Sequence, residues 1–394
     1  MERLQCPIGA NITLADLEQN FHPLLHRLRA HEPVSWIPAL DSWLVTRYDL
    51  AVEIMRDAKR FTVDHPGFST SQVVGPSMLS LDGDAHQMHR APFERPFRKR
   101  EVEAAFQDSV SLDVADLIDG FAANGEAELR RDFAGPVAVR TMITALGLGY
   151  VSTATILTWY DAIVDAVTRV TMGKPAGPRG EVALAALRDH LLPIIRGQGD
   201  SLLALASGLA SGLSADKIVS NAAILLFGGV ETTEGLIANT LYFLLTDGEL
   251  MAQVRRQPTL IPTVVEESLR MEPSVNLVDR YATCDVQVGD ALIKEGELVH
   301  VALSAANRDP AIFPEPDFFN PRRTNLRSHV TFAQGPHVCL GLHLARLEAV
   351  HAIEQIVSKL QNLRLQPSAD ALAAATPRGF VFRKPAALYA IWNT

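Results

Sequence analysis

The order of apolar and polar residues predicts a mainly helical chain. Between Leu81 and Gly248 apolar residues recur at the spacing of one helix face, with few interruptions. Earlier, two short runs at Pro33–Trp36 and Trp43–Thr46 carry the bulky residues typical of strands and favour a small hairpin. This half of the chain therefore predicts a helical bulk with a minor sheet near the N-terminus.

The pattern changes after Pro273, where prolines and arginines become frequent and the strand-like pieces are short. Two of these pieces are Val286–Val288 and Leu298–Ala302. A final helix is predicted at Leu340–Leu363, and the tail from Thr376 again resembles strand. The fold class is thus mainly α with small β-sheets, the second sheet lying near the C-terminus. Since neither an internal repeat nor a flexible linker divides the chain, we expect one domain over residues 1–394.

One predicted helix is unusually long. Ser214 can cap its N-terminus, Asp216 lies in its first turn, and Gly248 offers a stop. About 33 residues lie between these signals, or roughly 50 Å at 1.5 Å per residue. An apolar helix of this length must cross the middle of the molecule.

Composition and charge exclude several classes of protein. Of the 394 residues 47% are hydrophobic, 21% are charged, and the formal net charge is −9. An acidic chain of this kind is not expected to bind nucleic acid or an anionic membrane surface non-specifically. Its longest strongly apolar stretch, Ala222–Val230, is far shorter than the roughly 20 residues needed to span a bilayer. The Met1 end has no targeting pattern, so we expect a cytoplasmic protein without a membrane anchor.

The candidate chemistry begins at one of only three cysteines, Cys339, since Cys6, Cys284 and Cys339 form no CxxC pair. Cys339 stands just before a predicted helix, where unpaired N–H groups and the helix dipole favour a thiolate. Gly335 and Gly341 would let the backbone pass close to a flat ligand and turn around the sulfur. The alternative is a buried structural cysteine.

The long helix carries a second candidate, the segment Gly228-Gly-Val-Glu-Thr232. Two adjacent glycines cost a helix roughly 1 kcal/mol each relative to alanine, so a chain that keeps them needs room or a local break there. The Thr232 hydroxyl can reach the Gly228 carbonyl or hold a water, and Glu231 is an acid within an apolar helix. The alternative is a pair of packing glycines beside a salt-bridged glutamate.

Two further pairs have helical spacing. Glu267 and Arg270 are three residues apart, so they can form an ion pair on one helix face. His86 and Arg90 are four apart and can point the same way.

Together these segments resemble the cytochrome P450 superfamily, whose haem-binding signature is FxxGxxxCxG. The chain matches that signature at Phe332, Gly335, Cys339 and Gly341, and the following Leu-Ala-Arg346 also fits. Ala333 and Gln334 depart from the commonest bacterial form. The resemblance implies the P450 fold over about Pro23 to Trp392 and haem b (iron protoporphyrin IX) as cofactor, with Cys339 as the iron ligand.

The resemblance also implies roles for the other candidates. Glu231 and Thr232 would be catalytic and deliver protons during dioxygen activation. Glu267 and Arg270 would form the structural ExxR element with Arg323, or with the neighbouring Arg322, and hold the cysteine loop. The side chains expected to bind the haem propionates are His86, Arg90, Arg280 and His337.

The substrate pocket is expected to be apolar. By position the loop from Phe61 to Leu79 resembles the first substrate-recognition segment of the family. The other expected lining positions share an apolar character and are Ala223, Phe227, Gly228, Val275, Leu277, Val278, Phe380 and Val381. Core packing is an equal alternative for each of them. Such a pocket favours an apolar or aromatic small molecule.

Electrons are expected to come from a separate protein, because no flavin- or nicotinamide-binding domain is attached and no GxGxxG occurs. The basic run Arg95-Pro-Phe-Arg98-Lys99-Arg100 would suit an acidic ferredoxin or flavodoxin, supplied by an NAD(P)H-dependent reductase. The alternative is a solvated surface turn.

The leading hypothesis is a monooxygenase that uses O2 to oxidise a small molecule. A haem-thiolate enzyme for oxidative coupling, desaturation or peroxide-driven oxidation is the second. Glu231 and Thr232 count against the peroxide-driven form, which does not need a proton relay. A non-catalytic haem sensor or carrier is the third, and it would need neither residue.

Overall fold

The structure is a computed structural model that describes residues 6–19, 21–171, 173–197, 199–209 and 212–394. The first five residues, part of the segment expected to lack a targeting signal, lie outside these ranges. The α-helices, in chain order, are α1 (Leu14–Gln19), α2 (Phe21–His31), α3 (Tyr48–Arg56), α4 (Ser69–Val74), α5 (Gly83–Glu94), α6 (Lys99–Phe121), α7 (Gly135–Leu146), α8 (Thr153–Thr171), α9 (Pro178–Arg196), α10 (Leu202–Leu209), α11 (Ala215–Thr246), α12 (Gly248–Arg256), α13 (Ile261–Met271), α14 (Leu303–Ala306), α15 (Leu342–Lys359) and α16 (Ala369–Ala375). The prediction of a mainly helical fold is confirmed.

The strands form three small sheets. They are β1 (Val34–Ile37), β2 (Ser42–Val45), β3 (Phe61–Thr62), β4 (Glu126–Glu128), β5 (Leu277–Ala282), β6 (Val286–Val288), β7 (Ala291–Ile293), β8 (Leu298–Ala302), β9 (Gln361–Leu365) and β10 (Tyr389–Asn393). The sheet orders are β1-β2-β8-β5-β3, β4-β10-β9 and β6-β7. The predicted N-terminal hairpin is present, with Val34 opposite Val45.

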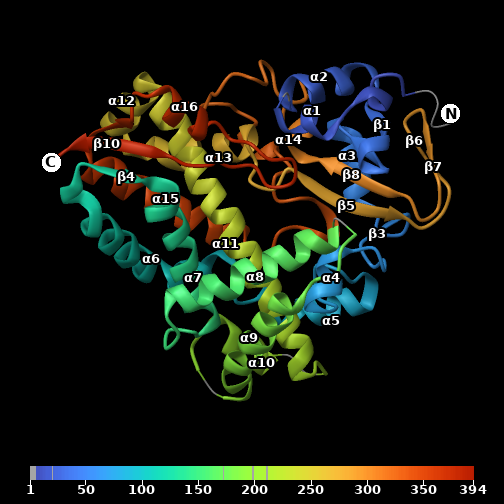
Figure 1. Ribbon diagram of the computed structural model, residues 1–394, viewed down its shortest axis with the longest axis horizontal. Coiled ribbons are helices and arrows are strands. Elements are labelled where there is room, and N and C mark those ends of the chain that lie inside the picture. The colour runs from blue at the N-terminus through green and yellow to red at the C-terminus, as the bar shows by residue number, and fades with distance from the viewer. Residues whose placement is uncertain (1–5, 20, 172, 198, 210–211) are drawn as a thin grey trace.

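A separate sheet near the C-terminus is present as β4-β10-β9, but the predicted Leu298–Ala302 strand belongs to the N-terminal sheet. The hairpin strand β2 pairs in parallel with β8, and Trp43 lies opposite Val299. Pairing between strands so distant along the chain is set by packing, which local pattern does not reveal. Strand β5 then joins β8 antiparallel. Early and late segments therefore build one mixed sheet, on the right in Figure 1.

Helix α11 crosses the middle of the molecule, as predicted (Figure 1). The Ser214 hydroxyl caps it by accepting a hydrogen bond from the Lys217 N–H. Its end differs from the prediction, because Asp247 follows the helix and caps α12 through the Glu249 and Leu250 N–H groups. Gly248 is consequently the first residue of α12 and not the stop of α11.

The C-terminal part also corrects the sequence reading. Helix α15 ends at Lys359, and the last residues of the predicted Leu340–Leu363 helix belong to β9. In the tail only β10 is a full strand; the rest makes isolated bridges such as Arg378 with Lys384. A short apolar run directly after a helix fits both the helical and the strand period. The hydrophobic period alone therefore placed the end of this helix too late.

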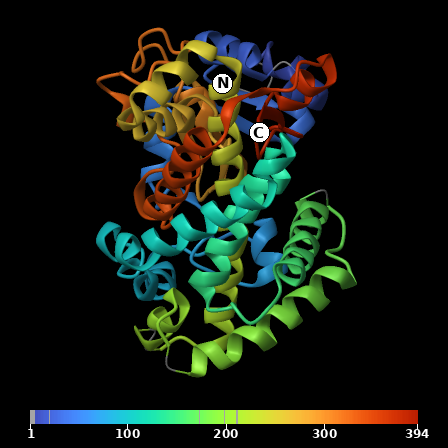
Figure 2. The ribbon, with the colours of Figure 1, turned by 90° about the vertical axis from the view of Figure 1, so that its left-hand side faces the viewer.

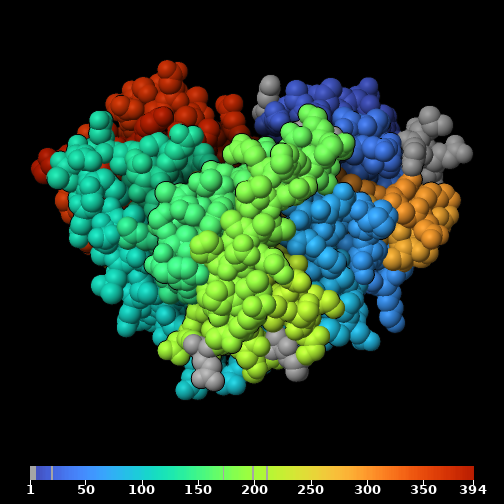
Figure 3. Space-filling view, turned by 60° about the horizontal axis from the view of Figure 1, so that its bottom comes forward, coloured from blue at the N-terminus to red at the C-terminus, as the bar shows by residue number. Residues whose placement is uncertain are grey.

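Different helices form the two opposite ends of the molecule. Helices α9 and α10 (green) lie at the bottom of the molecule in Figure 1, and the N-terminal helices α1 and α2 (dark blue) lie at its top (Figures 1 and 2). In the space-filling view the green segments run across the face between the teal helices and the blue N-terminal part (Figure 3). Within the described ranges, no helix combines the length and apolar character needed to cross a membrane.

Candidate active site

Cys339 lies in the loop between a short turn at Gly335–His337 and helix α15. Its N–H donates to the Phe332 carbonyl at 2.8 Å, which closes the loop on itself. The side chain is exposed, yet burial raises the pKa of the thiol, although the Gly341 N–H and the Arg90 and Arg346 charges lower it. A thiol that is accessible and still enclosed by protein faces an internal opening. The expected preference for thiolate is therefore not produced by the helix N-terminus alone.

The two glycines of the predicted haem-binding signature, Gly335 and Gly341, lie in different surroundings. Gly335 adopts a positive φ of +75°, and a Cβ there would lie 2.5 Å from the Met55 carbonyl oxygen of α3. Only glycine fits such a backbone-on-backbone contact. Gly341 has an ordinary φ of −81°, and a Cβ there would meet no atom within 4 Å. Gly341 therefore borders open space, which leaves room for a flat ligand close to the backbone, whereas its φ alone does not require glycine.

Three of the predicted anion-binding side chains belong to the cysteine loop or contact it, and the charge of the fourth, Arg280, interacts with that of Asp82 beside the loop. His86 and Arg90 both lie on α5 and point toward it: the His86 ring is 4.4 Å from the His337 ring, and Arg90 donates to the Val338 carbonyl at 2.8 Å. Arg280, on β5, is buried. His337 bonds Asp82 at 2.8 Å, an aspartate that the sequence reasoning missed. The topology thus brings polar side chains from α5 and the loop together.

Two of these side chains have buried nitrogen atoms without a partner among the described residues. They are Nε2 of His86 and one terminal guanidinium nitrogen of Arg280. Burial, followed by the His337 and Arg90 charges, lowers the pKa of His86 to about 4, so this ring is neutral at pH 7. Burial also lowers the pKa of Arg280. Unpaired buried donors are rare and costly, so these atoms fit an anionic ligand.

The adjacent glycines of α11 also separate into two roles. A Cβ at Gly228 would meet nothing within 4 Å, whereas one at Gly229 would lie 2.3 Å from the Met142 sulfur on α7. Gly229 is a packing glycine, and Gly228 borders open space. The Thr232 hydroxyl donates to the Gly228 carbonyl at 2.6 Å, which is the contact the sequence suggested. Hydroxyl lone pairs remain for a water.

Glu231 is more tightly held than the sequence indicated. The Tyr160 hydroxyl of α8 donates to its Oε2, and Lys384 Nζ lies 2.7 Å from its Oε1. The salt-bridged glutamate that was weighed as an alternative is therefore present. Neither partner carried a sequence signal, because both come from segments distant from α11.

The ExxR pair is present and buried. Arg270 donates to both carboxylate oxygens of Glu267 at 2.7 and 2.8 Å. Arg323, rather than Arg322, is the third member and donates to Glu267 Oε1 at 2.9 Å. Further Arg270 bonds reach the carbonyls of Asn307 and Pro316 at 2.9 and 2.8 Å. This network ties α13 to the meander that precedes the cysteine loop.

The expected pocket positions are not equally open. Ala223 and Leu277 are buried in packed clusters, as the core-packing alternative has it. Val381 is exposed, and the partly accessible positions are Phe227, Gly228, Val275, Val278 and Phe380. The Phe61–Leu79 segment is not all loop as predicted, since it contains β3 and α4, and it is fixed to α11 because Asn221 accepts from the Met78 N–H at 2.8 Å. Asn221 was missed; only its position as an amide in an apolar helix could have signalled it.

An enclosed thiol, open space beside Gly228 and Gly341, and buried unpaired donors describe a site for a flat anionic group held by sulfur. Haem meets each requirement: its propionates suit Arg280 and His86, and coordination to iron removes the thiol proton. This set of residues assigns the chain to the haem-thiolate proteins.

Comparison with known proteins identifies the family. The cytochrome P450 family model matches residues 199–389. Cytochrome P450 107B1 of Saccharopolyspora erythraea is 34% identical over 379 residues, which cover 90% of this chain and 91% of that protein. The 20-oxo-5-O-mycaminosyltylactone 23-monooxygenase of Streptomyces fradiae is 32% identical, covering 87% of this chain and 83% of its own.

A solved structure gives the same result. P450BioI, in complex with an acyl carrier protein bearing hexadec-9Z-enoic acid, superimposes with a TM-score of 0.83 at 27% identity, covering 95% of this chain and 99% of its own. The chain belongs to the cytochrome P450 family of monooxygenases, and its cofactor is a thiolate-ligated haem.

Proposed function

We propose that this P450 inserts one oxygen atom of O2 into an apolar or aromatic small molecule. Substrate, O2, two electrons and two protons give the oxygenated product and water. The apolar residues Phe227, Val275 and Val278, which are partly accessible, support this substrate class. The Streptomyces fradiae relative is a monooxygenase of a tylactone derivative by its name, which is also a small molecule.

In this proposal the cofactor is held at both ends. Cys339 would bind the iron through its sulfur, while Arg280, Arg90, His86 and His337 would hold the propionates. When bound, the haem supplies the iron chemistry that activates dioxygen and transfers an oxygen atom to the substrate. The ExxR network keeps the cysteine loop in place, because three buried charges and several carbonyls fix the segment before it.

The α11 residues supply protons. Thr232 orients a water through its hydroxyl, and Glu231 moves protons toward it from solvent. The single observation that carries this proposal is the 2.6 Å bond from Thr232 to the Gly228 carbonyl, at a glycine that borders open space. The room for a water comes from the open space beside Gly228, and the Thr232 hydroxyl lies at the edge of that space.

The experiment starts with a spectral-shift screen of apolar and aromatic compounds, and the tightest binder becomes the substrate for turnover. Thr232→Ala should lower the fraction of NAD(P)H electrons recovered in product by about tenfold and release them as peroxide. Thr232→Ser should restore most of the coupling, since it keeps the hydroxyl. Equal coupling in Thr232→Ala and wild type, with efficient peroxide-driven turnover in both, would favour the peroxide-using alternative.

For electron supply we propose that an acidic ferredoxin or flavodoxin docks beside the cysteine loop. Two groups of exposed cations lie at the ends of α3 and α5, the helices whose Arg56 and Arg90 bond to the loop. We call them together the basic surface: Arg56, Lys59, Arg95, Arg98, Lys99 and Arg100. Arg56 reaches the loop directly by donating to the Gln334 side chain at 3.0 Å. A positive patch on a chain of net charge −9 steers an acidic partner to this side.

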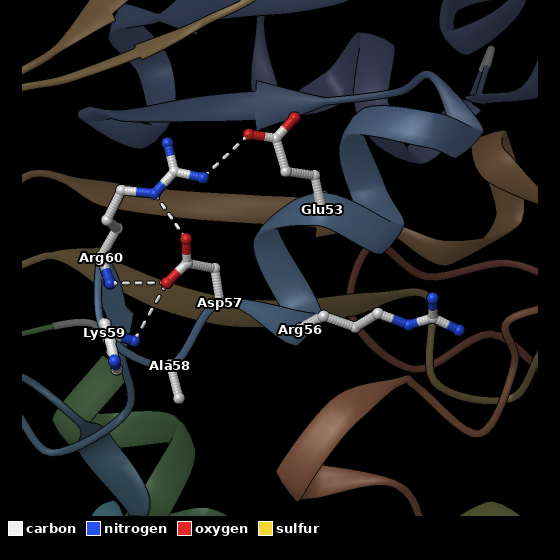
Figure 4. Close-up of a pocket in the computed structure, with 6 residues that line it drawn as sticks. All are labelled: Glu53, Arg56, Asp57, Ala58, Lys59 and Arg60. Carbon is white, nitrogen blue, oxygen red and sulfur yellow. Dashed lines mark hydrogen bonds and ion pairs between the residues drawn. The ribbon is translucent and has the colours of Figure 1, made fainter.

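A hollow of about 530 Å³ at the end of α3 forms one part of the basic surface. Arg60 is neutralised there by Glu53 and Asp57, at 3.0 and 2.5 Å. Figure 4 shows the Arg56 side chain directed away from this network. Arg56 and Lys59 are thus the residues at this hollow that would contact a partner.

Charge reversal tests the docking site. Arg98→Glu should slow reduction by a ferredoxin about tenfold at low salt and much less at high salt, because the effect is electrostatic. Arg364→Glu, an exposed substitution on β9, is the control. A loss that is equal for both variants, or independent of salt, rules out this surface.

A further inference from the structure

The side chain of Arg383 is buried inside the turn of residues 377–384, near the C-terminus. Arg383 is 4% exposed, and its two terminal nitrogens donate to the Pro377 and Gly379 carbonyls at 3.0 and 2.9 Å. Arg383 belongs to the outgoing half of the turn, whereas these carbonyls belong to the incoming half. The guanidinium therefore joins the two halves of the turn from within.

Arg383 is itself held by a buried anion and by its own backbone. Its Nε lies 2.5 Å from Glu272 Oε1. Burial alone would raise the pKa of Glu272, but the charges of His22 and Arg383 outweigh it and lower the pKa, so the carboxylate is ionised. The Arg383 N–H donates to the Ser274 carbonyl at 2.9 Å, and its carbonyl accepts from the Asn239 amide of α11 at 3.0 Å. Arg383 is thus fixed at both the backbone and the side chain.

The acceptors around this side chain suit an arginine and not a lysine. Three nitrogens of one planar group serve three different acceptors, the Glu272 carboxylate and the two carbonyls of the incoming half. The ring of Phe21, on α2, lies 4.1 Å from the guanidinium carbon, a contact that also favours a flat cation. A lysine would keep the charge beside Glu272, but its single nitrogen could not reproduce the three directed bonds.

The residue next to Arg383 contacts the expected substrate pocket. The ring of Phe382 meets that of Phe227 edge to face, with 5.8 Å between their centres, and Phe382 is partly accessible. Its backbone forms a bridge with Val275, a second expected pocket position. Phe227 directly precedes Gly228, which borders open space. Phe382, which the sequence reasoning missed, therefore lies at the same part of the expected pocket as Phe227 and Val275.

We propose that Arg383, held by Glu272, is a positioning residue that sets the place of Phe382 and thereby the width of the apolar pocket beside Phe227. Because the guanidinium braces the turn from within, the Phe382 ring is held in one place against α11. A wall with a defined position discriminates apolar ligands by their size and shape. This inference rests on the proposed function, in which an apolar pocket receives the substrate.

The test compares two azole ligands whose binding is read from the haem spectrum of the holoenzyme. Imidazole probes the iron alone, whereas phenylimidazole adds an aromatic group that needs apolar space. The quantity measured is the dissociation constant of imidazole divided by that of phenylimidazole. This ratio cancels any change at the iron that affects both ligands alike, so a purely structural role of Arg383 would not alter it.

Arg383→Lys should lower this ratio about fivefold, because the ammonium keeps the charge but releases the incoming half of the turn. Phe382→Ala should lower the ratio as well, since it removes the ring that forms the wall. In the Phe382→Ala background, Arg383→Lys should change the ratio by less than about twofold, because Arg383 acts through Phe382. If Arg383→Lys yields no holoenzyme, Glu272→Asp replaces it. This variant keeps the charge, withdraws the carboxylate from Arg383 by one methylene group, and should lower the ratio at least about twofold.

Arg255→Lys is the control. Arg255, on α12, is also partly buried and donates to a carbonyl, that of Leu360, at 2.6 Å. This substitution should leave the ratio unchanged.

An unchanged ratio in Arg383→Lys, or an equal fall in Arg255→Lys, would overturn the inference. A full effect of Arg383→Lys in the absence of the Phe382 ring would overturn it too, because Arg383 would then act by another route. The proposed apolar pocket fails in a different way, namely if wild type binds phenylimidazole no more tightly than imidazole.

Discussion

Arg346 of α15 and Glu266 of α13 form a two-point ion pair, with distances of 2.8 and 2.6 Å from the guanidinium to the two carboxylate oxygens. The same guanidinium lies 4.4 Å from the ring centre of Phe332, the first residue of the haem-binding signature. His329 adds a third contact to Glu266 at 3.0 Å. Helix α15, which follows Cys339, is thereby fastened to α13, the helix that carries the ExxR pair.

This pair should make stability depend on pH. Burial alone would raise the pKa of Glu266, but hydrogen bonds from Arg346 and His329 outweigh it and lower the value to about 2 from the usual 4.5. A carboxylate with a lowered pKa stabilises the native state above pH 4.5, and this contribution is lost as pH falls from 4.5 toward 2. Glu266→Gln should therefore lower the free energy of unfolding by about 3 kcal/mol at pH 7 and by progressively less below pH 4.5.

Urea unfolding at several pH values measures this difference. Glu295→Gln, an exposed substitution, is the control and should change little at any pH. A Glu266→Gln deficit that stays constant down to pH 3 would contradict the assignment.

The glycines of α11 predict opposite effects for the same substitution. Gly229→Ala places a methyl group 2.3 Å from the Met142 sulfur, so overpacking should cost about 1–3 kcal/mol. Gly228→Ala meets no atom and should gain up to about 1 kcal/mol from helix propensity. Thermal unfolding compares the two variants.

Ligand binding separates them further. Gly228→Ala should alter the affinity for phenylimidazole, an aromatic azole whose binding is read from the haem spectrum. The added methyl group fills open space at the expected pocket. Gly229→Ala should cost less stability in a Met142→Ala background than in the wild type, because the sulfur that the new methyl group meets is then absent. Equal destabilisation by Gly228→Ala and Gly229→Ala would contradict the finding that Gly228 borders open space.

The features that the sequence predicted correctly depend on residues close together along the chain. The cap at Ser214, the Thr232–Gly228 contact and the Glu267–Arg270 pair follow from spacing within one helix, and all three are present. The hairpin of β1 and β2 was predictable for the same reason, since a short turn joins its strands.

What the sequence could not predict involves partners from distant segments. Lys384, Tyr160 and Asp82 meet α11 or the cysteine loop only after folding, and no local pattern marks them. The different roles of Gly228 and Gly229 depend on which side of the helix faces Met142. Glu266 had a faint signal, as an acid directly before Glu267 in a helix that proved to be buried.

Arg280 should control retention of the cofactor. Its buried guanidinium has an unpaired nitrogen and burial lowers its pKa, so an anionic partner should stabilise the holoenzyme substantially. Arg280→Met should increase the rate of haem transfer to apomyoglobin at least about tenfold, as a charge-assisted bond of about 1.5–3 kcal/mol is lost. Arg364→Met, on the surface of β9, should leave the rate unchanged. Equal rates for Arg280→Met and wild type would place the propionates elsewhere.

Glu348, buried within α15, should limit stability at alkaline pH. Burial raises its pKa well above the usual 4.5 despite a hydrogen bond with Thr141, and its Oε2 has no partner among the described residues. Because the native state holds this proton and the unfolded chain releases it above pH 4.5, native stability falls as pH rises. Glu348→Gln removes the titration and keeps an amide of the same shape for Thr141.

The variant should therefore match wild type near pH 4.5 and exceed its free energy of unfolding by about 1–3 kcal/mol at pH 8. Chemical unfolding of both holoenzymes between these pH values measures the gap. Glu354→Gln, on the same helix and only half-buried, is the control and should show no such trend. A gap that does not widen with pH would mean that the Glu348 carboxyl is already ionised in the folded protein. Native stability declines with rising pH only if the folded protein keeps a proton that the unfolded chain has released.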